Sequence, residues 1–187
     1  EIMDKTTKSL VEALEERLTV LNQNPDSWSD ADLRFLDEFA DSRVIGLGEA
    51  THGTSEFFMA KSRIFKYLVE NHGFYVYAFE ADYGECVYIN DAVQKGQGSS
   101  IRNLMTEKMI FWTWKTKEVQ HLLEWMCSYN QDKTEEDKIQ YIGVDCQFNN
   151  YNTILLKEFL AEAGPAISDF AENILDSVKN AHDTQFE

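Results

Sequence analysis

Three short apolar runs, separated by stretches of helical pattern, constrain the fold more than any other feature of this sequence. The runs are RVIGLGE at 43–49, FYVYAFEA at 74–81 and KIQYIGVD at 138–145. Runs of this length and composition are typical of strands buried on both faces. The residues at 54–72 follow a helical spacing, so the first two runs and this helix predict a βαβ unit, in which the strands are parallel. The sequence therefore predicts an α/β fold built on a parallel sheet.

The 187 residues are enough to bury a core, and the pattern predicts one globular domain or a large part of one. We expect a helical lead-in at 1–41, a βαβ core at 42–147 with further helices near 85–94 and 117–129, and a helical segment at 148–187. No internal repeat separates these parts.

Each of the three predicted strands ends in an acidic residue, at Glu49, Glu80 and Asp145. The carboxyl ends of parallel strands lie on one edge of a sheet, and ligands of open α/β sheets bind beside that edge. Three carboxylates there repel one another unless a cation or a shared proton lies among them. We therefore expect Glu49, Glu80 and Asp145 to border one crevice.

A lysine and an arginine on the 54–72 helix are the candidate cations. Lys61 falls within the apolar stripe of that helix, where an unpaired charge is costly. It either extends its ammonium past the apolar layer or pairs with Glu49 or Glu80. Arg63 faces about 200° away, where a solvated salt bridge with Glu56 competes with a role in substrate binding.

The turn after the first run carries two glycines, a glutamate and a histidine. Gly46-x-Gly48 before a helix is similar to a dinucleotide-binding turn, but Glu49 is an anion where a pyrophosphate would lie. The turn is better suited to chemistry, because a neutral His52 near a helix N-terminus can act as a general base and can converge with Glu49. A purely structural histidine is the competing interpretation.

The charge balance excludes some classes of partner. With 33 acidic and 17 basic residues, the net charge of −16 repels nucleic-acid backbones and anionic membranes. No apolar run reaches membrane-spanning length, and no signal peptide is visible. We expect no nucleic-acid or membrane partner and cannot assign an oligomeric state. The compartment stays open, with a cytoplasmic location slightly favoured.

Successive blocks of the sequence resemble the erythromycin esterase family, which includes proteins labelled as succinoglycan biosynthesis proteins. The blocks are GEATHGTSEFF, GFYVYAFEADYGE, FWTWKTKEV, LLEWMCSYN and YIGVDCQ, in this order. The resemblance implies a three-layer α/β fold with helices on both faces of the sheet. It also implies that this chain is the N-terminal part of such a fold, because a second active-site histidine of the family would lie beyond Glu187.

The resemblance implies a role for four residues in ester hydrolysis. His52 would act as general base on a water that attacks the ester carbonyl, with Glu49 and Glu80 beside it. Lys61 takes the place of a basic helix residue that is arginine in other members, and a lysine offers a point charge instead of a bidentate fork.

Three functional classes follow from these observations. The first is an ester hydrolase without metal or other cofactor, acting on a small-molecule ester such as a macrolactone or an acyl sugar. The second is a metallohydrolase with Glu49, His52 and Glu80 as ligands, although a lysine in that shell argues against it. The third is a binding protein for a sugar-like ligand. Arg63, Asp145, Trp112 and Trp114 are the candidate substrate-binding residues, and core packing is the alternative for the two tryptophans.

Overall fold

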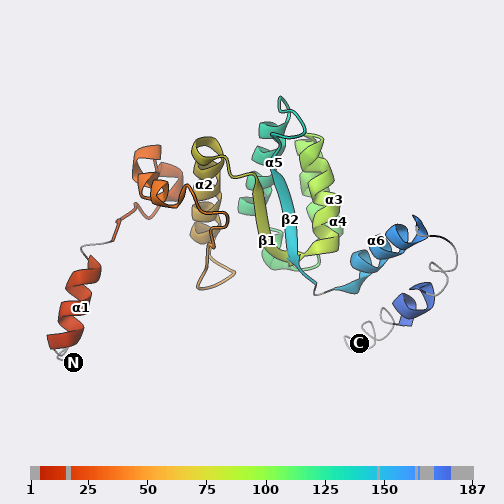
Figure 1. Cartoon of the computed structure of the whole chain (residues 1–187), viewed down its shortest axis with the longest axis horizontal. Coiled ribbons are helices and arrows are strands. Elements are labelled where there is room, and N and C mark those ends of the chain that lie inside the picture. Colours follow the sequence, from red (N-terminus) through yellow and green to blue (C-terminus); the bar gives the residue numbers. More distant parts are fainter. Residues whose placement is uncertain (1–4, 16–17, 147, 163, 165–170, 178–187) are drawn as a thin grey trace. The chain divides into compact units, whose positions relative to one another are not determined.

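The computed structural model describes residues 5–15, 18–146, 148–162, 164 and 171–177. The chain divides into two compact units. Unit 1 comprises residues 1–50 and 54–72, and unit 2 comprises residues 51–53 and 73–187 (Figure 1). The expected organisation as a single domain stays a prediction.

Unit 1 consists of helices. They are α1 (Lys5–Glu15), the 3₁₀ helices η1 (Pro25–Ser27) and η2 (Asp30–Phe39), and α2 (Ser55–His72). Ser29 and Asp32 form a capping box that starts η2, in which each side chain bonds the other residue's backbone. Leu33 and Leu36 of η2 are buried, and α2 contacts both η1 and η2. Two of these contacts are hydrogen bonds, in which Arg63 Nε donates to the Trp28 carbonyl and the Tyr67 hydroxyl donates to Asp37.

The predicted first strand is wrong. Residues 44–49 form no strand in the part of the chain that the structure describes, and Val44 is 85% exposed. A strand is defined by its hydrogen-bonded neighbour, and an apolar run by itself supplies none. Glycines at positions 46 and 48 further weaken the β propensity of this segment.

Unit 2 contains a parallel sheet, which confirms the α/β class. Strands β1 (Val76–Asp82) and β2 (Gln140–Asp145) pair in parallel from Val76↔Gln140 onward. The connection between them runs through α3 (Tyr83–Gln94), η3 (Gly98–Ser100), α4 (Ile101–Lys108), η4 (Trp112–Trp114) and α5 (Lys117–Asn130). Helix α6 (Asn149–Glu162) follows β2 (Figure 1). The sheet of the described residues has these two strands, so the fold is an incomplete α/β fold.

Side-chain amides bind the backbone of β2 and of Ile139, the residue before it, on the side away from β1. Asn90 Oδ1 accepts the Tyr141 N–H at 2.9 Å, and Gln94 Nε2 donates to the Ile139 carbonyl at 2.8 Å. Asn130, which is 1% exposed, accepts the Ile139 N–H and donates to the Ile139 carbonyl, both at 2.9 Å. These bonds satisfy backbone groups of a strand edge that would otherwise remain open.

Strand β1 contains a β-bulge near its carboxyl end. Phe79 pairs with Gly143 and Asp82 with Asp145, so two residues of β1 lie opposite one residue of β2. A Cβ at Gly143 would lie 2.6 Å from the carbonyl oxygens of Ala81 and Asp82. The bulge therefore requires glycine at position 143.

Among the residues that the structure describes, no helix has both the length and the apolar character needed to cross a bilayer.

Candidate active site

Lys61 of α2 forms an ion pair with Glu49. The two side chains are 15% and 9% exposed, respectively, and the Lys61 ammonium also lies 5.9 Å from the centroid of the Phe58 ring. The sequence predicted that Lys61 needs an acidic partner, and the pairing with Glu49 is confirmed. Both residues belong to unit 1, so the turn and the helix are joined by a charge pair that little water reaches.

Arg63 is engaged elsewhere in unit 1. Its Nε donates to the Trp28 carbonyl at 3.0 Å, and its Nη2 lies 2.5 Å from Asp30 Oδ1. The sequence placed Glu56 on the same helix face as a salt-bridge partner, whereas the observed acidic partner is Asp30. A role of Arg63 in substrate binding stays a prediction.

His52 lies against an aromatic side chain of unit 2. Its ring is edge-on to Trp114, with 5.0 Å between ring centroids and 70° between planes. Trp114 is 4% exposed and is also edge-on to Phe79 of β1 at 4.8 Å, whereas Trp112 is 74% exposed. The two tryptophans therefore differ: Trp114 is part of the core beneath the histidine and Trp112 faces outward.

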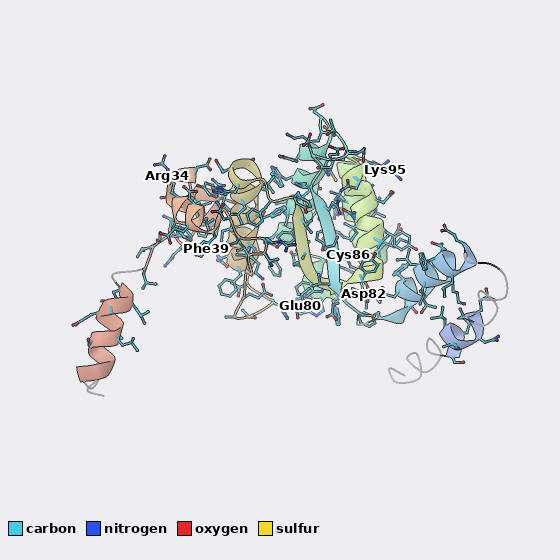
Figure 2. The ribbon with its side chains drawn as sticks, viewed as in Figure 1. Arg34, Phe39, Glu80, Asp82, Cys86 and Lys95 are labelled. Carbon is cyan, nitrogen blue, oxygen red and sulfur yellow. The ribbon has the colours of Figure 1, made fainter. Side chains whose placement is uncertain are left out.

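Glu80 lies in the bulge of β1, and it is not the last residue of the strand. The strand continues to Asp82, so the expectation that Glu80 ends it is wrong. The cause is the extra residue in the bulge together with Asp82, whose carboxylate starts α3 directly after the strand. Glu80 is exposed, and Figure 2 shows it with Asp82 near the end of β1 where α3 begins.

Asp82 is the acid that holds this end of unit 2 together. Its Oδ1 accepts the N–H groups of Gly84 and Glu85, which caps α3. Its Oδ2 accepts the Phe148 N–H at 3.1 Å, and Asn152 of α6 donates to both of its oxygens. Asp82 is 3% exposed, and these donors connect the end of β1 to α3 and α6. The sequence analysis did not single it out.

Asp145, the last residue of β2, is the register partner of Asp82. Its Oδ1 accepts the neighbouring Cys146 N–H at 2.7 Å. The predicted acid at the end of this strand is confirmed in position, and its role in substrate binding stays a prediction.

Glu85 is a buried acid that the sequence did not single out. It is 1% exposed, and its Oε1 accepts the Ile110 N–H at 3.0 Å, which ties α3 to the segment before η4. Burial, and to a smaller degree the charge of Asp82, raise the pKa of Glu85 to about 7 against the opposing effects of the Ile110 N–H and Lys115. The only signals in the sequence were its position three residues after the end of β1 and the small neighbours Gly84 and Cys86.

Within the described part of the chain, no group of three or more histidine, cysteine, aspartate or glutamate side chains is arranged to hold a metal ion.

The sequence model of the erythromycin esterase family matches residues 69–186. The chain belongs to the erythromycin esterase family. It is 27% identical over 161 residues to erythromycin esterase type II of Escherichia coli, covering 86% of this chain and 36% of that protein. It is 33% identical over 129 residues to a Bacillus subtilis protein named putative hydrolase YbfO, covering 66% of this chain and 27% of that protein.

The fold has a counterpart among solved structures. A crystal structure of a succinoglycan biosynthesis protein superposes with a TM-score of 0.75 at 27% identity, covering 96% of this chain and 45% of that one. This chain thus spans about a third of the length of the curated relatives named above and less than half of the solved structure.

Proposed function

We propose that the chain contributes to a hydrolase of the erythromycin esterase type, in which His52 activates a water molecule to cleave an ester bond. The observation that carries the proposal is the family match, which covers residues 69–186, together with a Gly-Glu-Ala-Thr-His-Gly turn upstream of it that contains Glu49 and His52. The names of the relatives, two of them an esterase and a putative hydrolase, support this reaction class.

The proposed chemistry begins with proton transfer from water to the His52 imidazole. The resulting hydroxide attacks the ester carbonyl carbon and forms a tetrahedral oxyanion, and the imidazolium then gives its proton to the leaving alcohol oxygen. In this proposal the edge-on contact with Trp114 favours one orientation of the His52 ring. In this proposal Glu49 or Glu80 orients the imidazole and Lys61 stabilises the oxyanion.

The proposed substrate is a small-molecule ester, either a macrolactone or an acyl sugar. Trp112 is the best candidate for an apolar contact with it, because a tryptophan that is 74% exposed has its ring available for packing. Arg63 and Asp145 complete the proposed set of substrate-binding residues. Trp114, by contrast, would act through His52.

Replacing His52 by Asn tests the proposal, because asparagine keeps much of the size and hydrogen bonding and removes the titrating ring. We expect single-turnover hydrolysis to fall by roughly two to four orders of magnitude, while the melting temperature hardly moves. A variant with the wild-type rate would refute the role of His52. The assay is a panel of macrolides and acyl-sugar esters, followed by liquid chromatography.

A chelator arm separates the two remaining classes. Turnover that is unchanged by a chelator supports the proposed mechanism, whereas turnover that is lost and then restored by zinc or manganese selects a metal-dependent hydrolase. Saturable binding of an ester on the panel, without any turnover, selects a binding protein.

A further inference from the structure

A cavity of about 560 Å³ lies in unit 2 between α4 and the beginning of α5. Met105 of α4, which is 3% exposed, supplies an apolar contact, and Gln120 of α5 supplies an amide. The other lining residues carry a permanent positive charge, a hydroxyl group or an imidazole: Arg102, Lys115, Lys117, Thr106, Thr116 and His121. None of the proposed hydrolytic residues is among them.

The charge of this cavity is opposite to that of the chain. The sequence has almost twice as many acidic as basic residues, yet among the described residues that line the cavity none is acidic and three are permanently cationic. Three cations around one hollow repel each other, and this repulsion is removed when an anion lies among them. The arrangement therefore favours an anionic ligand.

The beginning of α5 adds to the positive potential. Thr116 caps the helix by accepting the Val119 N–H at 3.3 Å, and Lys117 is the first helical residue. The N-terminal end of a helix carries partial positive charge, so Lys115 and Lys117 lie where cations are unfavourable. Glu118 in the first turn offsets part of this charge, but it does not line the cavity.

Two contacts hold polar groups at the cavity wall. Lys115 Nζ donates to the Thr106 carbonyl at 3.2 Å, and an ammonium has three donors, so this bond leaves capacity for a ligand. Gln120 Nε2 donates to Glu124 at 2.7 Å, which fixes the amide one helical turn inside α5. The cavity wall is thus positioned by α4 and α5 themselves.

We propose that this cavity binds a small molecule that bears a phosphate group. Arg102 offers a planar fork that matches two phosphate oxygens, and Lys115 and Lys117 add point charges. The volume suits a ligand of sugar-phosphate size, since small-molecule sites span about 300–1,000 Å³. The site is independent of the proposed hydrolysis, because binding at it needs no turnover.

Equilibrium binding measured by calorimetry on the purified protein tests the proposal. The probes are pyrophosphate, glucose 6-phosphate and glucose. We expect saturable binding of both phosphates, weakened by added potassium chloride as charge screening requires, and none of glucose. Tighter binding of glucose 6-phosphate than of pyrophosphate would show that the wall contacts the sugar as well as the anion.

Variants locate the binding. Arg102→Gln and Lys117→Gln should each raise the Kd of glucose 6-phosphate roughly tenfold or more, which is the usual effect of losing one charge-assisted hydrogen bond. Lys95→Gln, at the far end of α3 from Cys86 (Figure 2), removes an equal charge from unit 2 and should leave the Kd unchanged. Circular dichroism checks that each variant is folded. The proposal is overturned if neither phosphate binds, if glucose binds equally well, or if the three variants have equal affinity.

Discussion

At the scale of single residues, the pair formed by Lys61 and Glu49 is the clearest target. Both side chains are at most 15% exposed, so removing one partner leaves a poorly solvated charge behind. We expect Glu49→Gln to lower the free energy of unfolding by roughly 1–3 kcal/mol. Adding Lys61→Met to that variant should restore most of the loss, because both members of the pair are then gone. Urea unfolding of the single and double variants measures both effects.

Glu135→Gln is a matched control for the Glu49 and Lys61 variants. Glu135 is also paired with a lysine, Lys138, but its side chain is 83% exposed, and surface pairs contribute about 0–1 kcal/mol. If Glu49→Gln and Glu135→Gln change the stability equally, burial does not strengthen the Lys61–Glu49 pair. If Lys61→Met fails to rescue Glu49→Gln, Glu49 stabilises the fold through other contacts.

At the scale of elements, the bulge of β1 depends on Gly143. A methyl group at this position would meet two backbone oxygens of β1 at 2.6 Å, and backbone cannot move aside as a flexible side chain can. We expect Gly143→Ala to cost about 1–3 kcal/mol, as overpacking does. Gly46→Ala is the control, because nothing lies within 4 Å of its added carbon and its effect should stay within about 0.5 kcal/mol. Equal effects in urea unfolding would contradict this account of the bulge.

The contact between Glu85 of α3 and the Ile110 N–H predicts that the stability of the fold depends on pH. In the folded state the pKa of Glu85 is raised from 4.5 to about 7, so folding favours the protonated carboxyl. The contribution of Glu85 to stability is therefore fully present below pH 4.5 and is lost as pH rises through about 7. The full difference is on the order of 3 kcal/mol.

Glu85→Gln tests this linkage, because glutamine still offers an oxygen to the Ile110 N–H but does not titrate. We expect the wild type to lose stability relative to this variant between pH 5 and pH 8, as measured by urea unfolding across that range. Parallel stability curves for the two proteins would show that Glu85 has an ordinary pKa. Glu85→Leu, which removes the acceptor, should be less stable than Glu85→Gln at every pH, since it leaves the Ile110 N–H without this bond.

At the scale of the whole molecule, local patterns predicted the elements better than their ends. The helix at 117–129 was predictable because helical spacing acts over short stretches, and the parallel direction of β1 and β2 was predictable because strands joined through helices run parallel. The segment 44–49 has the composition of a strand, but whether it pairs depends on residues distant in sequence. Asp82 and Glu85 were missed for the same reason: their importance comes from partners at Phe148, Asn152 and Ile110.

The candidate site was predictable where one helix or one turn determines it. An inward-facing lysine required an acid, and Glu49 is that acid. By contrast, no spacing rule could show that Trp114 lies beneath His52 while Trp112 is exposed, because that contact joins residues 62 positions apart.

The acidic surface as a whole predicts that salt stabilises this protein. A net charge of −16 at pH 7 repels itself in the compact state, and sodium chloride screens that repulsion. Raising the salt from low to physiological ionic strength should therefore increase stability by on the order of 1 kcal/mol, or about 2–4 °C in Tm. Near pH 4.6, the isoelectric point of the sequence, the net charge vanishes and the same salt step should have little effect. Scanning calorimetry at both pH values measures the difference, and a Tm that falls with salt at pH 7 would mean that attractive pairs such as Lys61–Glu49 outweigh the net repulsion.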